Sequence, residues 1–279
     1  MKIPWKLKSF IFGLIDLLNA HRILYFLQKH VTKRSRVGVL RITTIWENHK
    51  KFLTKYGATS FIFEFGAGKT LAQNLFLSDI VGKQLVVDLN DMIDLQLVDN
   101  VREQIHQSLA LQSEVKIDSL KALSQYGIDY RAPYDAAQTD LQDKSIDACI
   151  STNTLEHIPK DDIISIFYEL HRILKDSGIV SAKIDYTDHY SHTDKTISLL
   201  NYLKFDEHVW KRYNHACHYQ NRLRHYEYLE IFRKCGFVVK EEELVYAESS
   251  IPTELFEVFT DKDETWKATA AHIILKKAD

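Results

Sequence analysis

The chain has 279 residues, a formal net charge of −2 and a hydrophobic content of 45%. These values exclude a long disordered protein, and they fit one large α/β domain that buries its core without disulfide or metal staples. The three cysteines, Cys149, Cys217 and Cys235, lie far apart and form no Cys-x-x-Cys pair. We therefore expect a reducing compartment, the cytoplasm, and no zinc knuckle.

The charge is distributed unevenly along the chain. Residues 1–41 contain nine Lys or Arg and one acid, Asp16, a net charge of +8 that leaves −10 for the remainder. Residues 5–28 carry apolar side chains at helical spacing, but the apolar run from Phe10 to Leu18 is too short to span a bilayer. Two interpretations remain open: a helix that covers the edge of the domain, or one that lies in a membrane surface. The acidic body argues against nucleic acid as a partner, and the oligomeric state stays open.

Apolar runs then alternate with helical patterns. Such alternation predicts a doubly wound, mostly parallel sheet with its ligands at the carboxyl ends of the strands. We expect a basic helical extension over residues 1–56, a domain over 57–279 and a helical acceptor lid around 185–225. The expected strands are 61–63, 84–88, 128–132, 147–151, 178–184, 237–244 and 268–275, and the expected helices are 39–56, 70–77, 98–111, 115–125, 160–174 and 226–235.

The segment Phe61–Gly68 is an apolar strand that runs into two glycines one residue apart, which suits a backbone turning closely past a ligand. A Walker-type phosphate loop is excluded because Phe63 stands where that loop needs a glycine. A dinucleotide fingerprint is incomplete because Leu71 occupies the third glycine position. Glu64 instead suits a ligand that has a positive centre and an amino group.

With that acid, Glu64–Gly68 resembles the first motif of class I S-adenosylmethionine-dependent methyltransferases of type 11. The resemblance continues through Asp135–Asp147, Ile150–Pro159 and Glu169–Gly178, and covers residues 61–184. It implies a Rossmann-like seven-stranded sheet and S-adenosylmethionine as the methyl donor. Asp88 would bind the ribose hydroxyls and Asp135 the adenine amino group. The cofactor-binding residues it implies are Glu64, Phe65, Gly66, Ala67, Gly68, Asp88, Leu89, Asp135, Ala136 and Asn153.

Methyl transfer to a hydroxyl also needs a proton acceptor. His189 and His192 are the candidate catalytic bases; the alternative is that they only hydrogen-bond within a polar loop. Asp188-His189-x-x-His192 and Glu156-His157 contain metal-ligand types, but we expect no metal. The polar side chains expected around the acceptor are Asn153, His157, Asp185, Tyr186, Asp188, His189 and His192.

The lid is rich in aromatic and basic residues. Tyr186, Tyr190, Tyr202, Trp210 and Tyr213 are expected to stack on an acceptor, and Arg222 and Arg224 either bind an anionic group or pair with Glu227 and Glu230 on a solvated helix face. The lid resembles methyltransferases of bacterial surface-polysaccharide pathways. We therefore expect O-methylation of a sugar or another polar small molecule. The alternatives are a non-catalytic scaffold or regulatory subunit that binds the same cofactor, and a nucleotide-dependent dehydrogenase.

Overall fold

The computed structural model describes residues 3–18, 44–108, 114–247 and 251–278. Seven strands form one sheet in the order β3-β2-β1-β4-β5-β7-β6, in which β7 runs antiparallel to both of its neighbours. This arrangement confirms the predicted fold class. The strands are β1 (Phe61–Phe65), β2 (Lys83–Val87), β3 (Ile128–Arg131), β4 (Ile146–Thr152), β5 (Leu174–Asp185), β6 (Phe237–Tyr246) and β7 (Ala268–Lys277).

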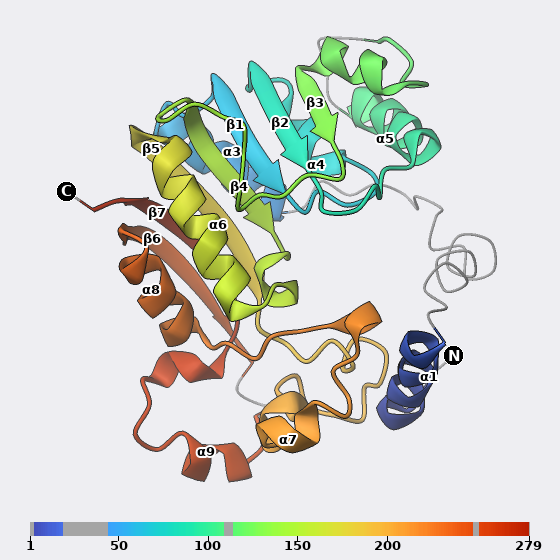
Figure 1. Cartoon of the computed structure of the whole chain (residues 1–279), viewed down its shortest axis with the longest axis vertical. Coiled ribbons are helices and arrows are strands. Elements are labelled where there is room, and N and C mark those ends of the chain that lie inside the picture. Colours follow the sequence, from blue (N-terminus) through green and yellow to red (C-terminus); the bar gives the residue numbers. More distant parts are fainter. Residues whose placement is uncertain (1–2, 19–43, 109–113, 248–250, 279) are drawn as a thin grey trace.

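Helices cover both faces of the sheet (Figure 1). α6 and α8 lie on one face, and α3, α4 and α5 lie on the other, because each presents an apolar stripe toward the strands. The helices are α1 (Trp5–Leu17), α3 (Thr44–Lys55), α4 (Ala72–Leu77), α5 (Leu95–Ser108), α6 (Lys160–Ile173), α7 (Glu207–Trp210), α8 (His225–Lys234) and α9 (Glu254–Val258), with 3₁₀ turns at Leu120–Tyr126, Leu155–His157, Asn201–Lys204, Ala216–His218 and Glu264–Lys267.

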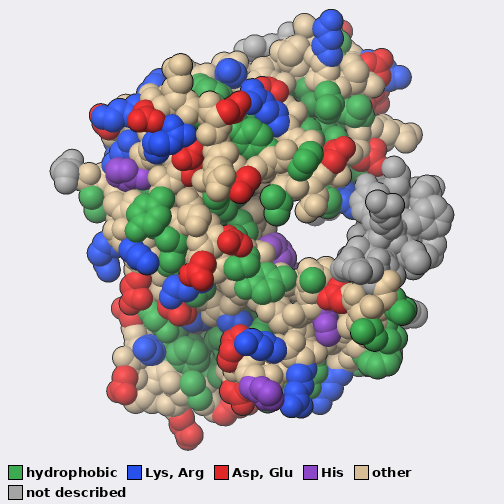
Figure 2. Space-filling view, viewed as in Figure 1, with side chains coloured by type: hydrophobic (Ala, Val, Ile, Leu, Met, Phe, Trp, Pro, Cys, Tyr) green, Lys and Arg blue, Asp and Glu red, His purple; other side chains and the backbone are tan. Residues whose placement is uncertain are grey.

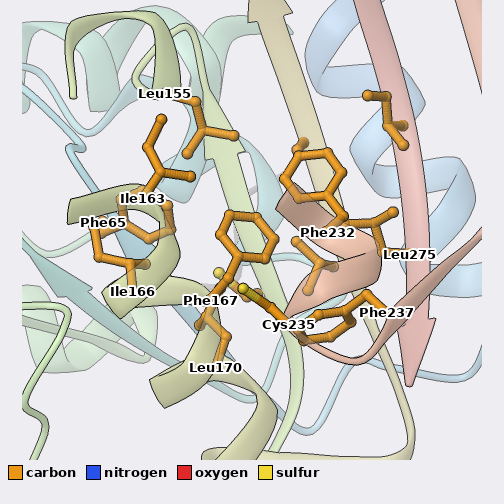
Figure 3. Close-up of a cluster of buried hydrophobic side chains, with 14 of the residues drawn as sticks. Phe65, Leu155, Ile163, Ile166, Phe167, Leu170, Phe232, Cys235, Phe237 and Leu275 are labelled. Atoms are coloured by element: carbon orange, nitrogen blue, oxygen red, sulfur yellow. The ribbon is translucent and has the colours of Figure 1, made fainter. Parts of the chain in front are cut away.

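The core under α6 and α8 shows how this packing is achieved. Phe167 of α6 lies 4.5 Å from Phe232 of α8, ring centre to ring centre, and meets Phe237 of β6 nearly edge-on at 5.7 Å (Figure 3). All three side chains are buried. The aromatic packing fixes the last two strands against the parallel part of the sheet.

Two expected helices differ from the structure. The helix expected at 115–125 is a 3₁₀ helix from Leu120 to Tyr126, which ends at Gly127 with φ +69°. Before it the chain is held extended, since the Ile117 N–H donates to the Asp99 carboxylate at 2.9 Å. The helix expected from residue 70 starts at Ala72, because Leu71 has left-handed backbone angles. The expected helical residues 19–28, 39–43 and 109–111 lie outside the described part of the chain.

After β5 the chain leaves the sheet into residues 185–225, the segment predicted as a lid and called the lid below, which lies beside α1 (Figure 1). Its helical content is limited to the four-residue α7 and two 3₁₀ turns. The parallel strands β1 and β4 are adjacent although β2 and β3 intervene in the sequence. Their carboxyl ends are therefore the point where the strand order reverses, which is where such sheets bind ligands.

Candidate functional site

A cavity of about 590 Å³ lies at the carboxyl ends of β1, β2 and β4. It is bounded on one side by the glycine turn after β1 and on the other by the start of α6. Six of the ten residues predicted to bind the cofactor line it: Phe65, Gly66, Asp88, Leu89, Asp135 and Ala136.

The glycine turn is held close to the neighbouring strands. The Gly66 N–H donates to the Val87 carbonyl at 2.9 Å, and the Gly68 N–H donates to Asp88 Oδ2 at 3.1 Å. Gly66 has φ +74°, and a Cβ there would lie 2.8 Å from Thr154 Oγ1 and closer still to its Cγ2. Only glycine fits at this position, because both the backbone angle and the contact exclude a side chain.

Two predicted carboxylates, those of Asp88 and Asp135, line the cavity. Asp88 directly follows β2, and burial raises the pKa of its carboxyl, an effect that the Gly68 N–H partly opposes. Asp135 lies beyond β3, where its Oδ1 accepts from the Ala137 N–H at 2.8 Å. The two segments are joined by a 2.9 Å hydrogen bond from the Tyr134 N–H to the Asp88 carbonyl. The arrangement suits a ligand with hydroxyl groups at one end and an amino group further on.

Glu64 differs from its predicted position. Its carboxylate does not line the cavity but lies in the interior, where it accepts from Gln73 Nε2 at 3.1 Å and Asn74 Nδ2 at 2.5 Å. Burial raises the pKa of Glu64 to about 7, although these two amides lower it. The Glu64 side chain therefore lies in the interior next to α4, where it can support the glycine turn but does not face the cavity.

A hydrogen-bond network extends from Glu64 across the sheet. Gln73 also accepts from Thr152 Oγ1 at 2.9 Å, and Thr152 in turn bonds His49 Nε2 at 3.0 Å. His49 Nδ1 then bonds Ser181 Oγ at 2.8 Å, so the network reaches β5. Both oxygens of Glu64 are hydrogen-bonded, and the network behind them fixes the position of this carboxylate in a region that would otherwise favour apolar residues.

Asn153, Ala67 and Gly68 also do not line the cavity. Asn153 has φ +49°, a left-handed angle that asparagine tolerates, and its N–H donates to the Lys183 carbonyl at 2.8 Å. This turn places the next residue, Thr154, over Gly66. Asn153 thus acts on the cavity through the backbone.

Three imidazole rings lead from the cavity toward the lid. His157 lines the cavity, its ring centre lies 4.8 Å from that of His189, and His189 lies 4.9 Å from His192. His157 Nδ1 bonds the Tyr219 carbonyl at 2.9 Å, so this nitrogen carries the proton and Nε2 is the basic atom. Neither predicted catalytic residue lines the cavity: His189 lies one ring beyond His157, and His192 lies two rings beyond it.

His192 is oriented by a hydrogen-bond relay. Thr187 Oγ1 donates to Asp185 Oδ1 at 2.7 Å and must then accept from His192 Nε2 at 2.9 Å. This pattern leaves Nδ1 as the basic nitrogen of His192. Burial lowers the pKa of His192, with a further contribution from His189 that Asp185 opposes. His192 is exposed whereas His189 is nearly buried, so His192 has the better access to an acceptor.

The metal-ligand types group differently from the predicted pattern. Asp188 faces away, since it accepts from the Tyr190 N–H at 2.8 Å and from Asn201 Nδ2 at 3.0 Å. Among the described residues, ligand atoms lie within 4.8 Å of one another in two groups: Glu156, His157 and His189, and Asp185, His189 and His192. The absence of a resident metal stays a prediction.

Glu156 is the most unusual member of these groups. It is buried, and neither carboxylate oxygen has a hydrogen-bond partner among the described residues. Burial raises its pKa to about 8, which the nearby backbone N–H groups only partly offset. At neutral pH the side chain is therefore largely protonated, a form that binds cations poorly.

The lid aromatics do not face an acceptor. Tyr190, Tyr202 and Trp210 are buried in a small core with Trp5 of α1, and Tyr186 is buried in the main core. The prediction that they offer free stacking faces is wrong, because each ring is covered by its neighbours. Three of these aromatic residues form a second hydrophobic core with Trp5, and this core packs the lid against α1.

Both predictions for the lid arginines, anion binding and side-chain pairing with Glu227 and Glu230 on a solvated helix face, are wrong as well. Arg224 is buried and donates to the carbonyls of Trp266, Ala268 and Tyr186. Arg222 donates to the carbonyls of Tyr202 and Phe205 and pairs with Glu207 at 2.7 Å. Arg222 thus bonds acceptors within the lid, and Arg224 bonds both the lid and the start of β7, so both guanidinium groups are held by protein partners.

A second cavity of about 600 Å³ lies between α7 and the beginnings of α6 and α8. It is lined by Lys160, Lys211, Asn214 and Tyr219 among others, and it contains none of the three histidines of the row. The residues predicted to bind the cofactor lie at the first cavity and not at this one. The polar residues of the first cavity that sequence analysis missed are Asn90, Tyr134, Gln138, Thr154, Asp162 and Ser165. Thr187, which orients His192, was missed as well. Several of these residues stand beside predicted site residues, which was their only sequence signal.

Comparison with known proteins agrees with this geometry. A sequence model described as a methyltransferase domain matches residues 83–182. The matched segment, 100 of the 279 residues, is similar to a methyltransferase domain. This match and the fold support S-adenosylmethionine as the methyl donor. Among curated proteins none matches the chain significantly.

Solved methyltransferase structures share the fold at low sequence identity. A candidate methyltransferase from Bacillus halodurans C-125 is 13% identical, with a TM-score of 0.51 over 83% of this chain and 100% of its own. The 1,6-didemethyltoxoflavin-N1-methyltransferase from Burkholderia thailandensis is 10% identical, with a TM-score of 0.51 over 100% of this chain and 92% of its own. A candidate S-adenosylmethionine-dependent methyltransferase from Listeria monocytogenes is 14% identical, with a TM-score of 0.50 over 84% of this chain and 98% of its own.

Proposed function

We propose that the chain transfers a methyl group from S-adenosylmethionine to an oxygen atom of a sugar or another polar small molecule. The observation that carries this proposal is the position of His157. It lines the cavity that contains Gly66, Asp88 and Asp135, and it begins the row of imidazoles that ends at His192. In this proposal His157 borders the donor site, and His192 lies two rings further toward the lid.

The residues of the cavity fit the donor. Gly66 leaves room for close approach, Asp88 has a carboxylate at the end of β2 where ribose hydroxyls bind, and Asp135 offers an acceptor for an amino group. The Burkholderia thailandensis structure holds S-adenosylhomocysteine beside a small-molecule acceptor, which supports a donor of the same kind here.

S-adenosylmethionine supplies an activated methyl group, so the protein needs only to orient the acceptor and remove its proton. We assign proton removal to His192 Nδ1. The Asp185–Thr187 relay fixes the opposite nitrogen as the donor, and the lowered pKa of His192 keeps its ring neutral near pH 7. His189 packs between His157 and His192, and in this account it helps to orient both rings.

The resemblance of the lid to methyltransferases of surface-polysaccharide pathways supports a sugar acceptor, and the net charge of −10 after residue 41 argues against nucleic acid. The test is transfer of labelled methyl groups from S-adenosylmethionine into sugars, nucleotide sugars and cell-envelope extracts. We expect label in a sugar-containing fraction, attached through an ether bond. Label that appears only in protein or nucleic acid would contradict the proposed acceptor class, and absence of transfer to every fraction would contradict the activity.

The alternative of a non-catalytic subunit predicts a different result. Such a protein would bind S-adenosylhomocysteine but would transfer no label to any extract. A dehydrogenase would bind NAD instead. The methyl-transfer assay, together with a binding assay for S-adenosylhomocysteine and NAD, therefore distinguishes the three functions.

A further inference from the structure

The helix α1 has two faces with different roles. Its inner face is fixed to the lid: the Trp5 N–H donates to Asp194 Oδ2 at 2.8 Å, and Asp16 Oδ2 accepts from the Ala216 N–H at 2.5 Å. Trp5 is buried, and its ring lies 4.8 Å from that of Tyr213. These contacts join both ends of the helix to the lid, so its orientation is set by the fold.

The outer face of α1 is apolar, and the other described parts of the chain leave it exposed. Six of the fifteen exposed large hydrophobic side chains among the described residues lie on this helix and at its end, each between 41% and 80% exposed: Leu7, Phe10, Ile11, Leu14, Leu17 and Leu18. Their spacing of three and four residues places them on one stripe. Figure 2 shows hydrophobic side chains gathered over α1 at the edge of the molecule. A contiguous patch of this kind marks an interaction surface, whereas isolated apolar side chains do not.

The charge around this stripe indicates what covers it. Lys6 is exposed beside the stripe, and residues 1–41 as a whole carry a net charge of +8. An apolar stripe in a segment of the sequence rich in Lys and Arg is typical of a helix that lies in a lipid surface, with its basic groups among anionic headgroups. The same excess of Lys and Arg in residues 1–41 disfavours pairing with the corresponding segment of a second copy. None of the described helices is long and apolar enough to cross a bilayer.

We propose that α1 docks the chain on an anionic lipid surface, with its outer face at the boundary between headgroups and acyl chains. The inner face stays on the lid during docking because its hydrogen bonds lie on the opposite side of the helix. The lid also carries Asp185 and His192, so docking holds the acceptor side of the candidate site near the lipid. The proposal concerns a surface distinct from the cavity and does not depend on the reaction catalysed.

Co-sedimentation of the full chain with vesicles tests this inference. We expect binding to vesicles of phosphatidylcholine and phosphatidylglycerol in equal amounts, at least tenfold weaker binding to phosphatidylcholine alone, and weaker binding as salt rises. The double variant Phe10→Glu/Leu14→Glu should bind the anionic vesicles at least tenfold less. The matched control is Leu120→Glu/Val258→Glu, which adds the same charge at two exposed apolar positions outside α1 and should bind like the wild type.

Unchanged vesicle binding by the α1 variant, or an equal loss in the control, would overturn the proposal. So would a wild type that ignores vesicles but forms dimers that the α1 variant abolishes, because the outer face would then bind a second copy. The unfolding temperature and the affinity for S-adenosylhomocysteine serve as folding checks. If the Glu variant fails to fold, Leu17→Ser/Leu18→Ser, at the two most exposed positions of the stripe, gives the same test.

Discussion

Thr154 lies directly over Gly66, so that its hydroxyl oxygen would be only 2.8 Å from a Cβ on the glycine. The contact joins the end of β4 to the turn after β1, on the wall of the cavity. Gly66→Ala should therefore lose affinity for S-adenosylhomocysteine and destabilise the fold by about 1–3 kcal/mol, the cost of a non-glycine residue at a strained backbone angle. Calorimetry and denaturant unfolding would measure the two effects.

A second substitution separates the two causes. Thr154→Ala removes the closest atoms and should restore part of the stability of Gly66→Ala, because only the backbone strain then remains. A Gly66→Ala protein that binds the ligand normally would show that the turn does not approach it.

Asp88→Ala should cost about 1.5–3 kcal/mol of affinity for S-adenosylhomocysteine, since it removes a charged hydrogen-bond partner of the ribose. Asp91→Asn is the matched control, because Asp91 is exposed on the same loop and does not line the cavity. Equal affinity of the Asp88 variant and the wild type would mean that the ribose does not bind at the end of β2.

His192→Gln should lower turnover by about 100-fold or more, the range of general base catalysis, and leave cofactor affinity intact. In the wild type, turnover should fall as the pH drops through the pKa of His192, which burial places below 6.5. Thr187→Val should reduce turnover and alter that acidic limb, because Thr187 only orients the ring. His208→Gln, an exposed lid histidine, should behave like the wild type. Normal turnover of the His192 variant would place the base elsewhere.

Removal of divalent metal ions should leave turnover unchanged, because the account assigns proton removal to the imidazole of His192. Dialysis against a chelator, followed by the methyl-transfer assay, measures this directly. Loss of activity that added metal restores would assign the groups around His189 to a cation instead.

Glu64 makes stability depend on pH. Its pKa is raised from 4.5 to about 7 by burial, so between these values the folded state holds a proton that the unfolded state releases. The free energy of unfolding therefore falls as the pH rises through this window, by about 3 kcal/mol relative to Glu64→Gln. Denaturant unfolding at pH 4 and pH 8 tests this difference. Glu257→Gln, on the exposed surface of α9, should show no such change between the two pH values.

The order of strands and helices was predictable because buried parallel strands leave continuous apolar runs, such as Phe61–Phe63, between amphipathic helices. The glycine turn and Asp88 were predictable for a related reason, because one strand-helix unit separates them, whereas Asp135 was identified only through the resemblance to the methyltransferase family. The predictions that were wrong concern side chains whose positions are set by hydrogen bonds or packing with residues elsewhere in the chain. The Glu64 side chain points into the interior because Gln73 and Asn74 donate hydrogen bonds to it there. The sequence around Glu64 does not indicate this pairing.

The lid residues were mispredicted for the same reason, because their partners lie far away in the sequence. Tyr190, Tyr202 and Trp210 look like a polar binding surface in the sequence, yet they pack with Trp5, more than 180 residues earlier in the chain. In the sequence Arg224 has the pattern of a surface charge, but in the structure it is buried and donates hydrogen bonds to the backbone carbonyls of Trp266 and Ala268. The relay from Asp185 through Thr187 to His192 was missed because hydroxyl groups give no distinctive pattern.

The central claim is that the turn at Gly66 and the carboxylate of Asp88 bind S-adenosylmethionine. Calorimetric titration of the full chain with S-adenosylhomocysteine, and separately with NAD, tests it most directly. The account predicts saturable heat with S-adenosylhomocysteine that Asp88→Ala weakens, and no heat with NAD. No heat with S-adenosylhomocysteine, or tighter binding of NAD, would contradict it.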